Sequence, residues 1–293
     1  MEIKASTQRH FNLVGIVPTA GQKLDFSFPW HDSLQPIGRD YLAVEKAVLN
    51  CAIAGCRTIW IACPKDMQPL IRYRLGDYII DPYELNITTA FARYPARKEI
   101  PIYYVPIHPK DVDRRDSLSW SIITGAHAAY RAGKKISKWV TPDRYFVSFP
   151  YGVFPDRDLQ DCRPLARSHD PFYVSHQGKT FKDGLYLPFT FTPEDFLVAR
   201  KKVRTNETRS VDAQRKKVPV EDRWSGKAFL HDFVFQEVND VNANTVEASW
   251  YYDIGSWEGL KKWLGSDYSL DKPAEVILSY HEWNPIGVDN EKK

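Results

Sequence analysis

The sequence predicts an α/β fold with a parallel-rich sheet and helices on both of its faces. A near-continuous apolar run over residues 13–17 reads as a buried strand, and it leads through a polar loop to a helix-like segment over 41–54. Gly55 suits the end of that helix, and a second apolar run follows over 58–63. Strand, helix and strand in this order form a βαβ unit, which implies a parallel pair with a right-handed crossover.

Alternation of apolar runs and helical patterns continues along the chain, as expected for such a sheet. Residues 192–203 should begin a helix, because a Thr N-cap is followed by Pro and two acids. The other predicted elements are a short helix over 68–77, a strand over 100–107, a helix over 117–133, strands over 144–149 and 183–191, an amphipathic stretch over 226–238, and a strand, a turn and a helix over 246–265.

Length and composition favour a single domain over residues 1–270. The chain has 293 residues, 43% of them hydrophobic, which is enough for one large core. Residues 204–223 are polar and charged and are expected to form a loop or connector, and 271–293 form a C-terminal tail. Basic and acidic residues nearly balance, and the net charge of +3 is too small to predict a nucleic-acid partner. No apolar run is long enough to span a membrane.

The four cysteines and the N-terminus favour a soluble cytoplasmic protein. Cys51, Cys56, Cys63 and Cys162 form no C-x-x-C pair, so we expect core thiols in a reducing compartment rather than disulfides or a zinc site. The first residues lack the apolar segment of a signal peptide. The sequence has no G-x-S-x-G nucleophile elbow and no cysteine in a polar, basic setting, so it does not support nucleophilic catalysis.

Five segments stand in an order that resembles a known family. They read "GIVPTAG…LQPIG…YLAVEKAVLNCAIAGCRTIWIAC", "SIITGAHAAYRAG", "RYFVSFPYG", "KTFKDGLYLPFTFTPEDF" and "WYYDIGSWEGLKKWL". These segments and their order resemble those of the sugar-phosphate nucleotidylyltransferases. Their residues are most similar to those of divergent members carried by tailed phages. The resemblance implies a Rossmann-like mixed, mostly parallel sheet, the GT-A-like nucleotidyltransferase fold. For a phage protein, the compartment would be the host cytoplasm.

The resemblance also implies a reaction, its partners and a cofactor. A sugar 1-phosphate would attack the α-phosphorus of a nucleoside triphosphate, giving a nucleotide sugar and pyrophosphate. Such a displacement needs positioned phosphates, neutralised charge and usually Mg²⁺ held by carboxylates. The expected partners are therefore a nucleoside triphosphate and a sugar phosphate, and the oligomeric state stays open.

The nucleotide loop of the family appears here in a reduced form. Of the family's G-x-G-[ST]-R motif only Gly21 remains, and Lys23 would supply the positive charge without the forked geometry of Arg. A plain strand-to-loop turn is the alternative interpretation. By resemblance, Lys23 is a catalytic candidate, and the nucleotide contacts are Thr19, Ala20, Gly21, Gln22 and, on the later helix, Gly125.

Asp253 corresponds to a metal-binding aspartate of the family and is the candidate catalytic Mg²⁺ ligand. It follows a strand and precedes Gly255, so the alternative is a turn or N-cap residue for the helix starting near Ser256. The family's other aspartate is missing, because the strand ends in "FPYG" at 149–152. Asp156 or Asp158, just beyond, would have to reach back to replace it.

The sugar side is assigned to the segment "GKTFKDGLY" at 178–186. Lys182 is a catalytic candidate, because a lysine here can pair with a sugar phosphate as a point charge. The alternative for such a residue is a solvated hairpin lysine. The remaining substrate-binding candidates are Lys179, Asp183 and Gly184.

Three residues near these motifs keep two interpretations each. Asp32 stands at the position of a family lysine. It either reverses the charge of that lysine in the site or caps a turn. His31 donates to a phosphate or packs beside Trp30, and His127 is more often a packed histidine than a catalytic one. The lost motif residues support an alternative function: an inactive nucleotide- or sugar-binding relative acting as an interaction module. A glycosyltransferase of the same fold lacks a clear D-x-D motif here.

Overall fold

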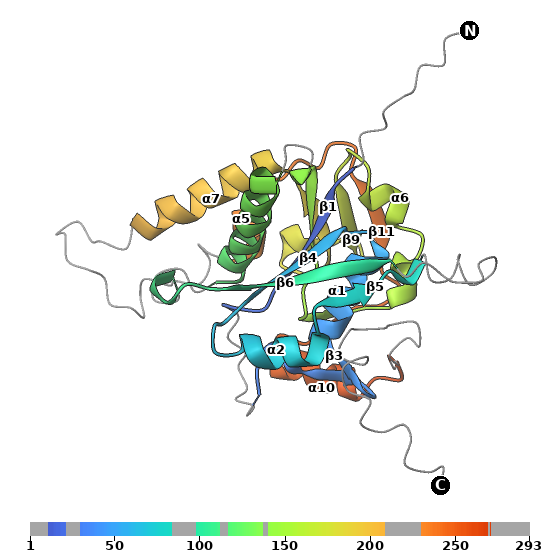
Figure 1. Ribbon diagram of the computed structural model, residues 1–293. Coiled ribbons are helices and arrows are strands. Elements are labelled where there is room, and N and C mark those ends of the chain that lie inside the picture. Colours follow the sequence, from blue (N-terminus) through green and yellow to red (C-terminus); the bar gives the residue numbers. More distant parts are fainter. Residues whose placement is uncertain are drawn as a thin grey trace, which may run out of the picture.

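The computed structural model describes residues 11–21, 30–83, 98–111, 117–136, 140–208, 230–268 and 270. Its centre is an eight-stranded sheet with the order β11-β9-β10-β7-β1-β4-β6-β5 (Figure 1). β1 (Leu13–Pro18) lies between β4 (Thr58–Cys63) and β7 (Arg144–Val147), and β6 (Glu99–Pro106) follows β4. These four strands are mutually parallel.

The strands outside this parallel centre make the sheet mixed. β10 (Phe189–Phe191) runs antiparallel to both β7 and β9 (Phe172–Ser175), and β11 (Asn244–Glu247) pairs parallel with β9. On the opposite edge, β5 (Tyr78–Ile80) runs antiparallel to β6. The predicted fold class, a mixed and mostly parallel sheet with helices, is confirmed.

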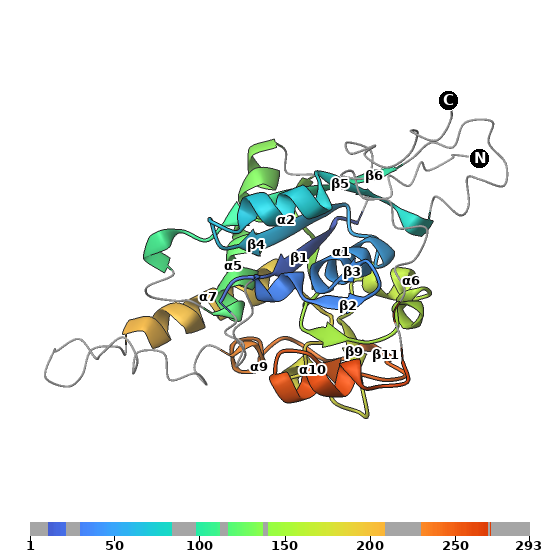
Figure 2. The same ribbon diagram turned by 90° about the horizontal axis from the view of Figure 1, so that it is seen from below.

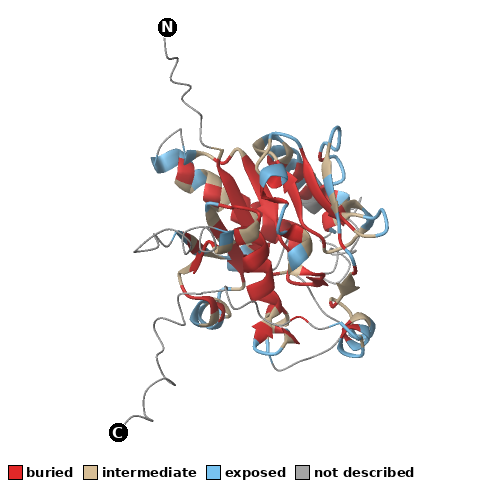
Figure 3. Cartoon of the chain, turned by 90° about the vertical axis from the view of Figure 1, so that its right-hand side faces the viewer, coloured by how far each residue is buried: buried red, intermediate tan, exposed pale blue. Residues whose placement is uncertain are grey.

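Helices cover both faces of the sheet, which explains why its central strands are continuous apolar runs. α1 (Ala43–Ile53) and α2 (Gln68–Leu75) share a core with Leu13 and Val17 of β1. α5 (Leu118–Ile136) and α7 (Pro193–Thr208) share the other core with Val14 and Ile16. Successive β1 side chains thus enter opposite cores. β1 is buried along its whole length, and buried residues fill the centre of the molecule (Figure 3).

Smaller elements complete the described chain. Seen from below, α10 lies near the pair β2–β3 (Figure 2), and Trp263 donates a 3.1 Å hydrogen bond from Nε1 to the carbonyl of Ile37. The remaining elements are η1 (Asp32–Leu34), β2 (Pro36–Gly38), β3 (Tyr41–Leu42), β8 (Gly152–Val153), η3 (Asp156–Leu159), α6 (Arg163–Ala166), η4 (Phe181–Asp183), α9 (His231–Val234), β12 (Tyr252–Asp253) and α10 (Trp257–Leu264).

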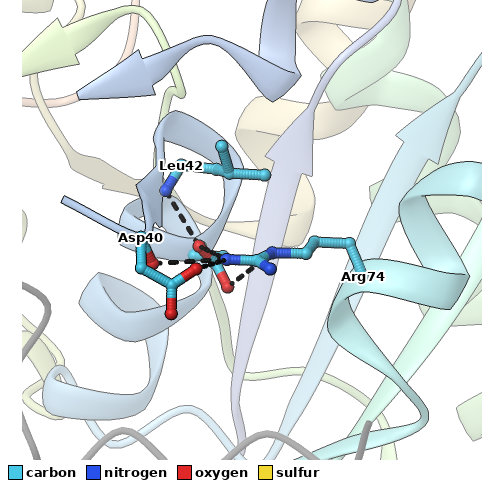
Figure 4. Close-up of polar contacts among 4 residues, drawn as sticks. Asp40, Leu42 and Arg74 are labelled. Atoms are coloured by element: carbon cyan, nitrogen blue, oxygen red, sulfur yellow. Dashed lines mark hydrogen bonds and ion pairs between the residues drawn. The ribbon is translucent and has the colours of Figure 1, made fainter. Parts of the chain in front are cut away.

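Buried ion pairs hold the start of α1 in place, where the adjacent charged residues Glu45 and Lys46 are both buried. Glu45 accepts a hydrogen bond from the Leu42 amide at 2.8 Å and pairs with Arg74 of α2 at 3.1 Å. Arg74 also reaches the Asp40 carboxylate at 3.0 Å (Figure 4). The neighbouring Lys46 pairs with Asp156. Each buried charge thus has an opposite partner, which burial requires.

Most predicted elements are present, but some differ in extent and several short strands were not predicted. The predicted strand over 183–191 is reduced to β10, because Gly184 is left-handed at φ +86° and ends η4. α7 continues to Thr208, into the predicted connector, and 226–238 contains the short helix α9. β9 was not predicted.

The predicted core thiols are confirmed, since all four cysteines are free and buried. Within the described residues, no helix is long and apolar enough to cross a membrane.

Candidate functional site

The strand order reverses at β1, and this reversal defines the candidate site. After β1 the chain adds β4 and β6 on one side, whereas β7 returns to the other side of β1. The carboxyl ends of β1 and β7 therefore lie next to each other, with Ser148 donating its amide to Ile16 at 3.0 Å. In open α/β sheets, ligands bind in the crevice outside the strands at such a switch point.

The loop after β1 is held by its neighbours on both sides. Thr19 donates its amide and its hydroxyl to the carbonyl of Ala62, at 2.9 and 3.0 Å. Ser121 of α5 donates to the carbonyl of Ala20 at 2.6 Å. Within the described part of the chain, the amides of Ala20 and Gly21 make no hydrogen bond. These two donors are therefore the candidates for a contact with a ligand.

Gly21 lets this loop approach the beginning of α5. It has φ +82°, and a Cβ at this position would lie 2.3 Å from the Ser117 backbone. Only glycine fits such a contact in the left-handed region. The 19-residue helix α5 starts at the next residue, Leu118. Its positive N-terminal end therefore lies beside the loop amides, an arrangement that favours an anion.

Asp253 lies at the same edge of the sheet. β12 pairs with β8, so that Asp253 stands opposite Gly152, directly beyond β7. Tyr151 connects the two halves of the site: its carbonyl accepts the amide of Ile254 at 2.9 Å, and its hydroxyl lies 3.4 Å from the carbonyl of Thr19.

The carboxylate of Asp253 is partly buried, and a single hydrogen bond offsets the cost of burying its charge. Oδ1 accepts the Gly255 amide at 2.7 Å, and Oδ2 has no hydrogen-bond partner among the described residues. Burial raises the pKa of Asp253, and the Gly255 hydrogen bond opposes this only in part. Ser256, not Asp253, is the N-cap of α10. The turn role of Asp253 is thus real, and it leaves one oxygen for a ligand.

The two aspartates just beyond "FPYG" are engaged elsewhere. Asp156 binds the buried Lys46 and accepts from the hydroxyl of Tyr41 at 3.1 Å. Asp158 accepts the amide and the hydroxyl of Ser249, at 2.7 and 3.1 Å. Neither reaches back toward Asp253 in this structure. No group of three or more metal-ligating side chains occurs in the described ranges.

His31 and Asp32 lie at the entrance to the segment after the β1 loop. Nδ1 of His31 accepts the amide of Ser33 at 3.2 Å and caps η1. Burial lowers the pKa of His31, and Asp66 raises it by a smaller amount. Asp32 lies near Tyr151. Burial is the main cause that raises the pKa of Tyr151, and the negative charge of Asp32 raises it further. His31 therefore has a capping role that its sequence position did not reveal.

Tyrosines contribute to the site in a way that sequence reasoning did not assign. The ring of Tyr186 packs beneath Gly255, where a Cβ would lie 3.0 Å from the ring. The amide of Tyr186 donates to the hydroxyl of Tyr251 at 3.0 Å. Nothing in the sequence around Tyr151 and Tyr251 marks them as site residues, because aromatic side chains pack in cores as readily as they contact ligands.

The predicted sugar-side residues lie in two adjoining turns. Lys182 donates its ammonium to the carbonyl of Val238 at 2.8 Å and to Asp240 at 3.0 Å. Asp183 accepts the Thr180 amide at 2.9 Å and completes a capping box. Lys179 is exposed in the tight turn that starts at His176, a turn closed by backbone hydrogen bonds of 2.8 and 3.0 Å.

The remaining predicted nucleotide contacts divide into a packing residue and two that cannot be placed. Gly125 lies on the face of α5 that packs against β1, and a Cβ there would be 3.1 Å from Ile16. Gln22 and Lys23 lie outside the described residues. The structure thus places Thr19, Ala20 and Gly21 in one loop, and Tyr151 links this loop to the strand end that carries Asp253.

Comparisons with known proteins add a distant likeness of fold. No protein-family model matches the chain, and no curated protein matches it. A solved structure from Bacillus anthracis, assigned as a glucose-1-phosphate thymidylyltransferase and determined with sucrose, is 13% identical, with a TM-score of 0.48 over 89% of this chain and 98% of that chain. A UDP-glucose pyrophosphorylase complexed with UDP-glucose is also 13% identical, with a TM-score of 0.48 over 86% of this chain and 97% of that chain. At this distance the likeness carries no argument about activity.

Proposed function

We propose that the protein is a nucleotidyltransferase that joins a nucleoside triphosphate to a sugar 1-phosphate and releases pyrophosphate. The supporting observation is that two amides without a hydrogen bond among the described residues, a helix N-terminus and the Asp253 carboxylate lie around the β1–β7 switch point. These parts come from three distant segments of the chain, and all three belong to motifs that resemble the nucleotidylyltransferase family.

In the proposed reaction an oxygen of the sugar phosphate forms a bond to the α-phosphorus, and the bond to the leaving pyrophosphate breaks. The amides of Ala20 and Gly21 would orient the triphosphate, and the N-terminal end of α5 would favour its negative charge. The fixed positions of these donors supply alignment, which is the main protein contribution to such a displacement.

Asp253 would suit a weak Mg²⁺ site, because its Oδ2 has no hydrogen-bond partner among the described residues. Protein-bound Mg²⁺ usually takes one or two carboxylates, with waters and substrate phosphates as the other ligands. A bound Mg²⁺ would neutralise part of the phosphate charge. The proposed partners are therefore a nucleoside triphosphate, a sugar phosphate and Mg²⁺.

The non-catalytic alternative has one observation in its favour. No cation appears among the described groups that shift the pKa of Asp253 or of Tyr151, whereas Asp32 does appear beside Tyr151. A negatively charged crevice suits a ligand with fewer charges, such as a sugar or a nucleoside. The protein would then bind this ligand as an interaction module and release no pyrophosphate.

Pyrophosphate release across a panel of nucleoside triphosphates and sugar 1-phosphates with Mg²⁺ tests the proposal. We expect turnover with at least one pair, and a loss of more than about a hundredfold in Asp253→Asn with the fold retained, typical of removing an electrostatic catalytic group. Asp161→Asn, on the exposed surface, is the matched control. Turnover by Asp253→Asn at the wild-type rate contradicts the role of Asp253. A ligand-induced thermal shift without turnover for any pair favours the binding module.

A further inference from the structure

Tyr151 lies in the turn between β7 and β8, and it contacts both sides of the crevice through different parts of the residue. Its side chain is 1% exposed, and its hydroxyl donates to the carbonyl of Thr19, 3.4 Å away in the loop after β1. Its own carbonyl accepts the amide of Ile254, directly after Asp253, at 2.9 Å. One residue therefore joins the loop, through its side chain, to the segment that carries the carboxylate, through its backbone.

The backbone contact holds the Asp253 segment whatever the side chain at position 151 is. Asp253 stands opposite Gly152 in the antiparallel pair of β12 and β8. A Cβ at Gly152 would lie 2.1 Å from the carbonyl oxygen of Tyr186, so the surrounding chains are in close contact. A substitution that changes only the hydroxyl of Tyr151 leaves this side of the crevice as it is.

The hydroxyl contact is the more adjustable of the two. The ring of Tyr151 packs against the ring of Tyr186, with the centroids 5.6 Å apart at an angle of 63°. Within the described ranges, the hydroxyl has the Thr19 carbonyl as its hydrogen-bond partner. A separation of 3.4 Å is long for a hydroxyl donor, and contacts in an empty site often shorten when a ligand completes it.

We propose that Tyr151 is a positioning residue of the crevice, and that its hydroxyl keeps the β1 loop aligned with Asp253. This inference rests on the proposed function, because it names the residue that lets both parts act on one nucleoside triphosphate. The amides of Ala20 and Gly21 would contact the phosphates from the loop, and Asp253 would face them from β12. A misplacement of about 1 Å can lower the rate of such a displacement about a hundredfold, so a link between the two parts matters for turnover.

Tyr151→Phe tests the link, because it removes the hydroxyl and keeps the ring and the backbone hydrogen bond. Tyr145→Phe is the matched control: Tyr145 is fully buried on β7, and its hydroxyl has no hydrogen-bond partner among the described residues. For pyrophosphate release we expect Tyr151→Phe to lower kcat at least about tenfold and to change KM less than about threefold. Tyr145→Phe should keep both values.

A double variant separates positioning from a general loss of structure. If Tyr151 acts by aligning the loop with Asp253, the two residues are coupled, and Asp253→Asn should cost less turnover in the Tyr151→Phe background than in the wild type. In the Tyr145→Phe background, Asp253→Asn should cost as much as in the wild type.

Amide hydrogen exchange gives a readout that does not depend on turnover. The amide of Thr19, which is bound to Ala62, should exchange at least about threefold faster in Tyr151→Phe, because the loop has lost one of its anchors. The amide of Ile254 is bound to the backbone carbonyl of Tyr151 and should exchange as in the wild type. A wild type without turnover would refute the proposed function, and this measurement would still judge the link made by Tyr151.

Three outcomes would overturn the proposal. The first is unchanged exchange of the Thr19 amide in Tyr151→Phe, which would show that the hydroxyl does not hold the loop. The second is an active wild type whose kcat is the same in Tyr151→Phe, or is lowered equally by Tyr145→Phe. The third is an equal cost of Asp253→Asn in the Tyr151→Phe background and in the wild type, which would show that the two residues act independently.

Discussion

The histidine buried behind the crevice predicts a specific loss of stability in mild acid. His231 is 4% exposed, and its ring lies 5.0 Å from the ring of Phe149 and 5.2 Å from that of Tyr186. Its Nε2 lies 3.3 Å from the carbonyl of Leu185, so Nε2 carries the proton and donates. Burial lowers the pKa of His231 from 6.5 to about 4, although Asp232 and this hydrogen bond oppose the shift.

The sign of the effect follows from proton binding in the two states. Between pH 4 and 6.5 the unfolded chain binds the proton at His231 and the native protein does not, so stability falls as pH falls through this window. Each pKa unit is worth about 1.36 kcal/mol, so the full loss below pH 4 is about 3 kcal/mol. Between pH 7.5 and pH 5.0 the expected loss from this group is about 2 kcal/mol.

Urea unfolding of the wild type and of His231→Phe at pH 7.5 and 5.0 measures this contribution. The variant removes the titration, so its loss of stability over this interval should be smaller by about 2 kcal/mol. His108→Gln, in an exposed loop, is the control and should behave as the wild type does. An equal pH dependence in wild type and His231→Phe would refute the reasoning, whatever the absolute stabilities are.

Two further pairs of variants test the contacts that hold the site in place. Arg74→Leu should lower the free energy of unfolding by about 3–5 kcal/mol, because it leaves the buried Glu45 carboxylate without its cation. Arg72→Leu on the same helix breaks only an exposed pair and should cost less than about 1 kcal/mol; equal losses in urea unfolding would contradict the difference. Gly21→Ala should weaken nucleotide binding at least tenfold in a calorimetric titration, because its Cβ collides with the start of α5. Gly178→Ala has a similar positive φ but meets nothing within 4 Å, so it should bind normally; matching affinities would show that the collision is harmless.

The parallel centre of the fold could be predicted because local pattern and tertiary environment agree there. β1 is buried along its whole length and β4 along most of it, so their apolar runs needed no knowledge of partners. β9 was missed although it is equally buried, because the segment "FYVS" is only four residues long and Pro and Asp precede it. The strand predicted over 183–191 is shorter than expected for a local reason as well, since Gly184 has a left-handed conformation and ends η4.

The candidate site was only partly predictable, because its members acquire their roles from distant partners. The sequence indicated Gly21 and Asp253 through its resemblance to the nucleotidylyltransferase motifs. It gave no sign that Lys182 is held by Asp240, which lies 58 residues further along the chain. It also gave no sign that Asp156 is taken by Lys46, 110 residues earlier. Long-range pairing of this kind decides which charged residues stay available for a ligand.

The same reasoning explains why Asp253 remains the strongest single candidate in the crevice. Asp156 and Asp158 have partners that account for their presence, one in a buried ion pair and the other holding the Ser249 segment. Asp253 gains one hydrogen bond from Gly255, yet burial still raises its pKa, so the isolated structure bears a cost at this position. Asn would make the same turn without that cost. The proposed role of Asp253 as a metal ligand therefore requires that Asp253→Asn keeps at least ordinary stability and alters ligand binding.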